Sequence, residues 1–481
     1  MSSTMKEGKL FIGGIWRDSR SAGKLTVINP ATEETIGYCA MADTKDIDEA
    51  LVAAHEAWLL WRISNPWDRT KVLRETARLL IEKKSEIALT ISQEQGKPIA
   101  EAEAEIQGSA EIFDWCADEA RRIFGEAIPA RSQDLRLWTI QSSVGPVAAF
   151  TASNFPALLA ARKMASAIAA GCSVILKPAE ETPFTAIALV ETLMVAGLPA
   201  GVINLLTGDP ELISQRLIAS PIIHKISLTG SVSVGQKLLK LAADRVIPST
   251  MELGGHAACI VTEKANLKEA AKAVVKGKWR NNGQVCIAMS RLIVQESIEK
   301  EFTDYLLAEL DELKVGPATD PSSTVGPLLN KRTLDRALSL TKNAIDNGGK
   351  ILSGGQVDSN FSNGYFFTPT IVSDPGDDAD IWQMEPFAPV LPMKTYKTLD
   401  EAIIFANSVP YGLAGYGFTT DLREAMRISA ELDVGMVGIN NLVIATAEAP
   451  AGGVKISGFG REGGPNPLND YLVTKYINVR I

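Results

Sequence analysis

The sequence has little histidine, few aromatic residues and no clustered positive charge. These shortages limit the classes of function that it can have. Only 3 of its 481 residues are histidine, and aromatic residues make up 6%. The net charge is -9 and no dense block of lysine and arginine occurs, so the basic surface typical of nucleic-acid binding is missing. We therefore expect a small-molecule partner and no nucleic acid.

Long apolar runs and paired cysteines are missing as well. No stretch of ~18 residues is continuously apolar, and the N-terminus lacks the apolar core of a signal peptide. Five scattered cysteines without a CxxC pair argue against a zinc site or a redox dithiol. We expect a cytoplasmic protein with free thiols, no membrane partner and no metal. The cysteines are Cys39, Cys116, Cys172, Cys259 and Cys286.

Apolar, β-rich runs alternate with helical patterns from residue 147 onward. Continuously apolar strands separated by helices form a parallel sheet that is covered on both faces. The sequence therefore predicts an α/β fold with a doubly wound domain, whose ligand lies at the carboxyl ends of the strands. The expected strands are 147–152, 173–178, 202–208, 225–230 and 250–255, and the expected helices are 157–170, 184–196 and 233–243. The strand ends carry Thr151 to Asn154, Lys177 to Glu180, Gly208 and Gly230 to Gly235.

The flanking regions predict further units. The first ~120 residues are expected to be mainly helical, to break at QGKP (95–98) and to carry little chemistry. A second α/β domain is expected from 256 to about 440, with strands near 257–261, 290–295 and 434–440 and a long helix near 297–313. The β-rich segments 136–143 and 471–481 have no helix after them. Because an open edge strand needs a partner, they predict an arm that joins another subunit.

Two glycine loops compete as the phosphate-binding turn. Residues 458–463 spell GxGxxG, but Pro465 and Pro467 follow where a helix should begin, so we reject this loop. Residues 230–235 follow a strand and open a helix, so backbone amides and the helix dipole suit a phosphate. Gln236 stands where a P-loop needs lysine, which argues against an NTPase.

Cys286 is the candidate nucleophile, because its Gly/Asn-rich loop suits a partly exposed, activated thiol. Glu252 ends a strand beside glycines and is the candidate general base, since a dehydrated site raises a carboxyl pKa toward neutrality. A Cys–His dyad through His256 is the weaker alternative.

Seven motifs then occur in order along the chain after Asn29-Pro30-Ala31-Thr32. They are TASNFP (151–156), ILKPAE (175–180), LTGS (228–231), MELGG (251–255), GQVC (283–286), EPF (385–387) and GGVKISGFGREGG (452–464). Together they resemble the aldehyde dehydrogenase superfamily over nearly the whole chain. The resemblance implies a Rossmann-type cofactor domain (1–122 and 142–253), an α/β catalytic domain (254–440), a β oligomerisation arm (123–141 and 465–481) and an active-site wall that returns toward the cofactor domain (441–464). It also implies a homodimer or homotetramer.

By the same resemblance, Cys286 attacks the aldehyde, and the side-chain amide of Asn154, with the backbone N–H of Cys286, stabilises the resulting oxyanion. Hydride passes to the nicotinamide, and Glu252 activates the water that hydrolyses the thioester. Lys163 and Glu462 match a network near this base, in which a salt bridge and a proton relay are equally open readings.

The resemblance also places the cofactor. Lys177 and Glu180 match the adenosine ribose positions, Gly230 and Ser231 the pyrophosphate turn, and Glu385 and Phe387 the nicotinamide ribose and ring. A carboxylate at Glu180 repels a 2′-phosphate, so NAD is expected to be preferred, with NADP open as a second cofactor.

Two arginines suggest the substrate. Arg162 and Arg280 match positions that carry arginine in enzymes similar to succinate-semialdehyde dehydrogenase, where a guanidinium pair suits a distant carboxylate. EQGKP (94–98) and the stretch 113–129 also resemble this group, and we read them as marks of ancestry. Enzymes acting on 2-oxoglutarate semialdehyde are similar too, so that substrate stays open.

Several positions near the nucleophile and in the pocket walls depart from the family pattern. Ala152-Ser153 replace Pro-Trp, Ala288 replaces a second cysteine, Ala445 replaces a serine and Ala451 replaces a phenylalanine. The smaller walls keep a bulkier or aromatic aldehyde open as the substrate. Other classes fit less well. Glu252 argues against a CoA-acylating enzyme, the complete set of catalytic residues against a silent NAD-binding protein, and the cofactor loop against a cysteine hydrolase.

Overall fold

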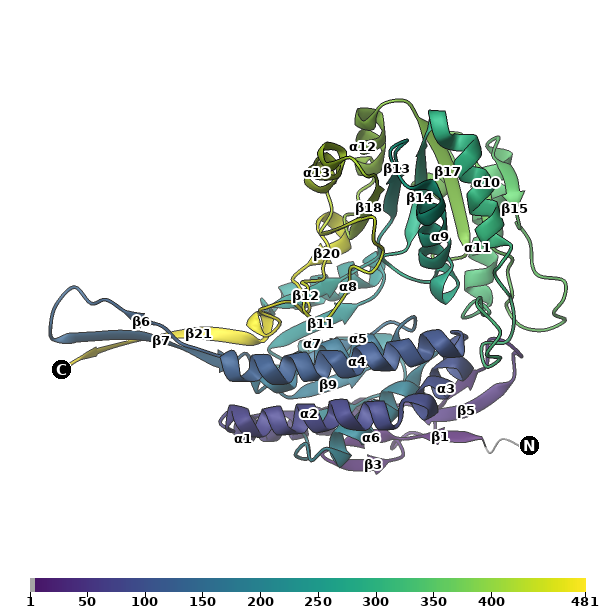
Figure 1. Cartoon of the computed structure of the whole chain (residues 1–481). Coiled ribbons are helices and arrows are strands. Elements are labelled where there is room, and N and C mark those ends of the chain that lie inside the picture. The colour runs from purple at the N-terminus through teal and green to yellow at the C-terminus, as the bar shows by residue number, and fades with distance from the viewer. Residues whose placement is uncertain (1–4) are drawn as a thin grey trace.

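The computed structural model describes residues 5–481 as two α/β lobes and a protruding β arm (Figure 1). The lower lobe in that view holds an eight-stranded sheet, and the upper lobe holds a seven-stranded sheet. Within the described chain, no helix has the length and apolar character needed to cross a membrane.

The eight-stranded sheet carries the predicted parallel core. Its strands lie in the order β20 (Gly458–Phe459), β12 (Ser249–Glu252), β11 (Lys225–Thr229), β8 (Val147–Phe150), β9 (Val174–Lys177), β10 (Ile203–Leu205), β2 (Leu10–Ile12) and β3 (Ile15–Arg17). The five strands from β12 to β10 are parallel, so their carboxyl ends share one edge. Strands at both margins pair antiparallel, which the apolar pattern did not predict.

Helices cover both faces of this sheet, as expected for a doubly wound arrangement. Alternate strand residues divide between two cores: Val147 and Leu176 pack with α2 to α6, whereas Ala148 and Ile226 pack with α1, α7 and α8. The helices are α1 (Thr44–Trp61), α2 (Pro66–Glu82), α3 (Lys84–Gln95), α4 (Ile99–Glu119), α5 (Pro156–Ala170), α6 (Pro183–Val195), α7 (Pro210–Ala219) and α8 (Val232–Ala243). The predicted break at 95–98 separates α3 from α4.

The seven-stranded sheet forms the core of the upper lobe. Its order is β15 (Lys350–Ser353), β16 (Thr370–Ser373), β17 (Val390–Tyr396), β14 (Met289–Gln295), β13 (Ala257–Val261), β18 (Ala414–Phe418) and β19 (Met436–Ile439). Only the edge strand β15 pairs antiparallel in this described sheet. The helices of this lobe are α9 (Leu267–Lys278), α10 (Glu299–Leu310), α11 (Lys331–Asp346), α12 (Leu399–Asn407) and α13 (Leu422–Glu431).

The expectation of a mainly helical N-terminus is wrong for the first 40 residues. Besides β2 and β3, this region forms a three-stranded sheet of β1 (Lys6–Gly8), β5 (Thr35–Ala40) and β4 (Lys24–Ile28). All five strands are only three to six residues long, too short for a period-two pattern to stand out.

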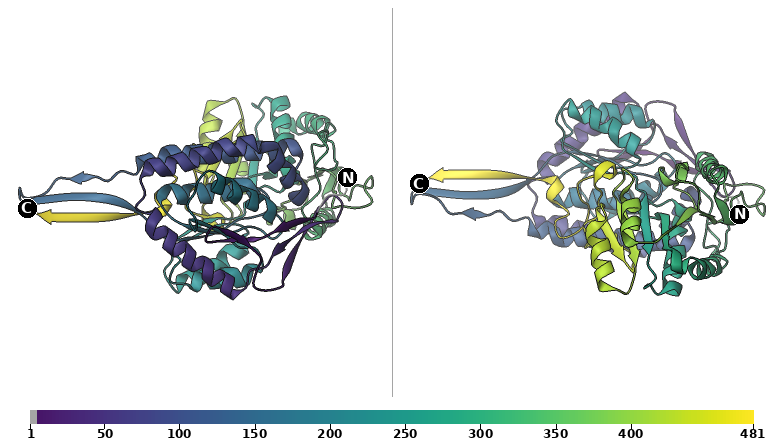
Figure 2. Two further views of the ribbon diagram at one scale, coloured as in Figure 1. Left: turned by 90° about the horizontal axis from the view of Figure 1, so that it is seen from below. Right: turned by 90° about the horizontal axis from the view of Figure 1, so that it is seen from above.

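The arm consists of β6 (Ala127–Ile128), β7 (Leu135–Ser143) and β21 (Leu472–Arg480). The two β-rich segments pair with each other, antiparallel from Leu472↔Ser143 to Arg480↔Leu135. Both views in Figure 2 show the arm projecting straight out of the body. β21 is an edge strand of this sheet.

Candidate active site

A pocket of about 100 Å³ brings four of the predicted site residues together: Cys286, Glu252, Arg162 and Arg280. Both lobes contribute to its walls, and most of the remaining lining is apolar. The other lining residues are Phe155, Leu158, Leu159, Thr229, Leu253, Val285, Ile287, Leu413, Met436, Leu442, Val443, Ile444, Ala445, Ala451 and Glu462. The departures Ala445 and Ala451 therefore lie on the wall, as the sequence suggested.

Cys286 follows a tight turn at the end of α9. Asn281 and Asn282 adopt left-handed backbone angles, with φ 47° and 56°, and a Cβ on Gly283 would lie 2.3 Å from the Ala388 carbonyl oxygen. Left-handed asparagines carry a small conformational cost that surrounding contacts must offset. The amide side chain of Asn282 donates to the Gly326 carbonyl at 2.7 Å and helps to hold this turn.

Cys286 is partly exposed as a residue, as predicted, but its surroundings do not lower the pKa of its thiol. Burial raises its pKa to about 12, and the nearby carboxylates of Glu385 and Glu252 act in the same direction. The structure does not show the activation expected for this thiol, because burial and the two carboxyl groups outweigh the backbone hydrogen bonds that lower its pKa.

Asn154 lies directly beside the nucleophile loop. Its side-chain Nδ2 donates to the Gln284 carbonyl at 3.0 Å, two residues before Cys286. Its own carbonyl accepts hydrogen bonds from Lys97 Nζ and Asn281 Nδ2. A primary amide has two N–H donors, so one remains for a ligand beside the thiol loop.

Glu252 ends β12 and lines the pocket, and its carboxylate oxygen Oε1 lies near Gly452. This atom is buried and has no hydrogen-bond partner among residues 5–481. Burial and the nearby Glu462 carboxylate raise the pKa of Glu252 well above its usual value. Glu462 in turn pairs with Lys163 at 2.8 Å, and Lys163 also donates to Ser227 Oγ at 3.0 Å. The carboxyl group of Glu252 is thus suited to take up a proton near neutral pH.

Arg162 and Arg280 reach the pocket from different elements. Arg162 of α5 makes only long hydrogen bonds, to the Glu462 and Thr446 carbonyl oxygens at 3.3 and 3.4 Å. The Arg280 guanidinium lies 5.0 Å from the centre of the Phe155 ring. Neither forms an ion pair with a carboxylate in the described part of the chain. Two guanidinium groups without an ion-pair partner favour an anionic ligand, although the carboxyl groups of Glu252 and Glu462 line the same pocket.

The predicted cofactor residues lie at the carboxyl edge of the large sheet. Lys177 at the end of β9 forms an ion pair with Glu180, and burial lowers the pKa of Lys177 to about 8. Gly230 follows β11, and Ser231 caps α8, its Oγ accepting from Val234 N at 3.3 Å. A Cβ on Gly235 would lie 2.6 Å from the Leu253 side chain, so glycine lets α8 approach the strand that carries Glu252.

Glu385 and Phe387 come from the other lobe. Burial raises the pKa of Glu385 to about 8, and the nearby Gly255 backbone amide acts in the opposite direction. A Cβ on Gly254 would lie 2.6 Å from Glu385 Oε2, so the glycine pair makes room for this carboxylate. Phe387 has φ 49°, a left-handed conformation unusual for an aromatic residue.

Unpartnered oxygens mark where a polar ligand fits. Glu252 Oε1, Glu385 Oε1 and Thr229 Oγ1 are buried without a hydrogen-bond partner in residues 5–481. Buried polar atoms normally have partners, so a hydroxyl-rich cofactor suits this edge. Thr229 was not singled out from the sequence, although it stands within the LTGS motif.

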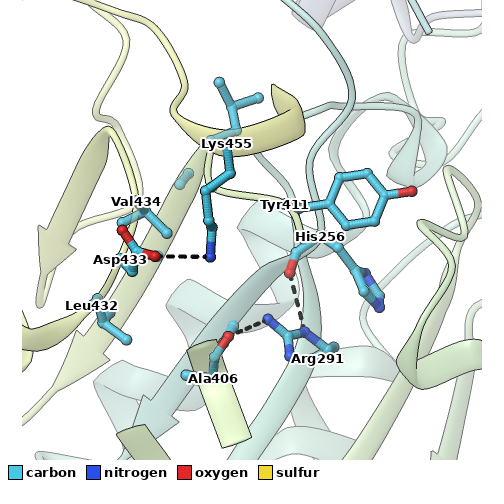
Figure 3. A pocket seen from close by; sticks show the side chains of 13 residues that line it. His256, Arg291, Ala406, Tyr411, Leu432, Asp433, Val434 and Lys455 are labelled. Carbon is cyan, nitrogen blue, oxygen red and sulfur yellow. Dashed lines mark hydrogen bonds and ion pairs between the residues drawn. The ribbon is translucent and has the colours of Figure 1, made fainter. Parts of the chain in front are cut away.

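Figure 3 shows a second, smaller cavity, in which His256 and Lys455 already have hydrogen-bond or ion-pair partners. It holds about 10 Å³, room for one water molecule at most. His256 bonds Ser290 Oγ and the Trp382 carbonyl, and Lys455 pairs with Asp433. Because both ring nitrogens of His256 are engaged, the Cys–His dyad has no support here. No cluster of three or more potential metal ligands occurs in residues 5–481.

Known proteins resemble the chain along its full length. The model of the aldehyde dehydrogenase family matches residues 16–477. Glutarate-semialdehyde dehydrogenase of Pseudomonas putida is 37% identical, over 99% of this chain and 100% of the relative. Succinate-semialdehyde dehydrogenase [NADP(+)] of Escherichia coli is 36% identical, over 99% and 98%. The crystal structure of succinate-semialdehyde dehydrogenase from Burkholderia pseudomallei superposes with a TM-score of 0.96 at 37% identity, over 98% of both chains.

Proposed function

Because the chain belongs to the aldehyde dehydrogenase family, we propose that it oxidises a semialdehyde bearing a carboxylate, through a thioester on Cys286. As a member of this family, it is an NAD(P)-dependent enzyme that converts an aldehyde to a carboxylic acid. The observation that carries the finer proposal is the pocket in which Cys286, Glu252 and two unpaired arginines meet.

Cys286 forms the bond to the aldehyde carbon, and the thiol passes its proton to solvent water as this bond forms. The negative charge then develops on the former carbonyl oxygen. The free N–H of the Asn154 amide and the Cys286 backbone N–H stabilise this oxyanion, and one such donor contributes ~3 kcal/mol. The hydrogen bond from Asn154 to Gln284 supports this role, because it holds the amide beside the loop.

Glu252 acts after oxidation. It accepts a proton from the water that attacks the thioester carbonyl, which releases the acid and regenerates the thiol. Its raised pKa and unpartnered oxygen support a base that works near neutral pH. The Lys163–Glu462 ion pair sets the local charge around this base.

The nicotinamide cofactor supplies the hydride acceptor. Lys177 and Glu180 would hold the adenosine ribose, Gly230 and Ser231 the pyrophosphate, and Glu385 with Phe387 the nicotinamide ribose and ring. The Glu180 carboxylate favours the 2′-hydroxyl of NAD over the 2′-phosphate of NADP. The ion pair with Lys177 moderates this preference, because a cation already lies beside the carboxylate.

The substrate carries a carboxylate at its far end, and succinate semialdehyde is our first choice. Arg162 and Arg280 support an anionic tail, since neither forms an ion pair with a carboxylate within residues 5–481. The apolar wall supports a methylene chain between the aldehyde and that tail. Glutarate semialdehyde, which is one carbon longer, is the main alternative substrate, because a similar protein is named for it.

The arm supports an oligomer. β21 is an edge strand, and Val473, Tyr476 and Val479 on it are exposed apolar residues. An exposed apolar edge is suited to pairing with a second copy of the chain. We propose a homodimer or homotetramer in the cytoplasm, with neither nucleic acid nor membrane as a partner.

A rate panel tests the function directly. Wild-type enzyme is assayed with NAD and NADP against succinate semialdehyde, glutarate semialdehyde, butanal and benzaldehyde. We expect the highest kcat/KM with a carboxylated aldehyde and NAD. A preference for butanal or benzaldehyde over both semialdehydes would overturn the substrate assignment.

A further inference from the structure

Lys97, in the EQGKP motif, is fully buried. Its ammonium group contacts Asn154, which lies 57 positions later in the sequence. Its Nζ forms an ion pair with Glu105, donates to the Asn154 carbonyl at 2.8 Å and lies 3.7 Å from the centre of the Phe155 ring. The side chains of both Lys97 and Glu105 have 0% exposure. A fully buried ion pair is weak evidence of added stability. The position of this pair beside Asn154 therefore suggests its role better than its strength does.

Glu105 fixes the chain just beyond Asn154. Its Oε1 accepts hydrogen bonds from Ala157 N at 2.8 Å and Leu158 N at 3.1 Å, in the first turn of α5. The first amides of a helix have no partner within the helix, and a carboxylate there is also favoured by the helix dipole. The Lys97–Glu105 pair therefore holds Asn154 by its own carbonyl and by the amides three and four residues later.

Glu101 extends this support to the nucleophile loop. It lies one turn before Glu105 on α4, and its Oε2 accepts from Asn281 N at 2.7 Å. The Asn281 side chain donates to the same Asn154 carbonyl at 2.9 Å. One helix of the N-terminal region thus braces both the turn that carries Asn154 and the loop that carries Cys286.

We propose that Lys97, Glu101 and Glu105 are positioning residues that hold the Asn154 amide against the Cys286 loop and thereby set the rate of oxidation. The inference rests on the proposed role of Asn154 as an oxyanion donor. The remaining N–H of Asn154 stabilises charge only if it meets the new oxyanion at hydrogen-bond distance. A displacement of ~1 Å costs about 100-fold in rate. The EQGKP motif, which we interpreted from the sequence only as a mark of ancestry, would then also support catalysis.

The first test compares Lys97→Met with Arg69→Met. Arg69 is also a buried cation, but it bonds the Ala169 carbonyl at the opposite end of α5. Thermal unfolding, NAD affinity and the single-turnover rate of NADH formation are measured for each. We expect both variants to lose stability, and only Lys97→Met to lose rate, by roughly 10- to 100-fold with NAD affinity within about twofold. Equal rates for the two variants would overturn the proposal.

Glu105→Gln provides a second route if Lys97→Met does not fold. Its matched control is Glu94→Gln, because Glu94 caps α6 as Glu105 caps α5, through Phe184 N and Thr185 N at 2.9 Å. We expect a slower single turnover in Glu105→Gln alone. An equal loss of rate in both variants would point to a general effect of a lost cap and would contradict positioning.

A double-mutant cycle separates this inference from the proposed function. If Lys97 acts through Asn154, Lys97→Met lowers the rate by less than about threefold once Asn154→Ala is present, because coupled residues are not additive. The full loss in the Asn154→Ala background overturns the inference. A wild-type rate in Asn154→Ala itself overturns the oxyanion role and the inference with it. A slow Asn154→Ala enzyme beside a fast Lys97→Met enzyme overturns the inference alone.

Discussion

Arg162 and Arg280 line one pocket with Cys286, although one lies on α5 and the other in the turn after α9. Replacing Arg280 with Met should lower kcat/KM for succinate semialdehyde roughly 10- to 100-fold relative to butanal, because a charge-assisted hydrogen bond contributes about 1.5–3 kcal/mol. Lys272→Met, which removes an exposed charge from α9, is the control. If Arg280→Met and Arg162→Met leave the ratio of kcat/KM for the two aldehydes unchanged, these arginines do not bind the substrate carboxylate.

The pH dependence of turnover should follow Glu252. Its carboxylate is the active form and its pKa is raised, so kcat should fall as pH decreases through a value well above the usual carboxyl range. Glu252→Gln should slow steady-state turnover by about 10²- to 10⁴-fold and remove this acid limb, while the first turnover of NADH persists. An unaltered pH profile in Glu252→Gln would assign the base elsewhere.

Two neighbours should move that acid limb in opposite directions. Glu462 raises the pKa of Glu252 and Lys163 lowers it. Glu462→Gln should therefore shift the limb to lower pH, since it removes a like charge and leaves Lys163 unpaired. Lys163→Met should shift it to higher pH. Profiles of kcat against pH check the pair, and shifts of the same sign would contradict the electrostatic account.

Cofactor choice should depend on Glu180. Glu180→Ser removes the carboxylate that disfavours a 2′-phosphate and frees Lys177, so the ratio of kcat/KM for NADP to that for NAD should rise roughly tenfold. Glu181→Ser removes the adjacent carboxylate and should change the ratio much less. An equal rise in both variants would indicate a general charge effect.

The oligomer should depend on the arm. Val473 and Val479 lie on one face of β21 and are exposed, so lysine at both positions should weaken assembly through this edge. Sedimentation velocity measures the outcome. Ile15→Lys, at an exposed apolar residue outside the arm, is the control. Unchanged assembly in the arm variant would place the interface elsewhere.

Regular packing was the part of the fold that the sequence predicted well. The apolar runs around Val147, Val174 and Lys225 became parallel strands, because burial on both faces leaves a continuous hydrophobic pattern. The three-residue strands β2 and β3 were missed, because so short a segment has no visible period. The glycine-rich strand β18 was missed as well, since two glycines and an alanine, which are depleted in strands, make up most of AGYGF.

The sequence predicted the site residues that stand in family motifs. It did not predict the properties that depend on tertiary contacts. Cys286 and Glu252 stand in recognisable motifs, and the structure brings them into one pocket. The raised pKa of the thiol was not predictable, because it depends on burial and on Glu385, which lies about 100 positions later in the chain. Lys97 was missed for the same reason, since its contact with Asn154 spans 57 positions.

The central claim is a thioester on Cys286, and trapping it is the most direct test. Glu252→Gln enzyme is mixed with NAD and succinate semialdehyde, quenched in acid and analysed by intact and peptide mass spectrometry. The account predicts one succinyl group on the peptide that contains Cys286, and none in the Glu252→Gln/Cys286→Ala double variant. An acyl group on another residue, or NADH formation by Cys286→Ala at the wild-type rate, would contradict it.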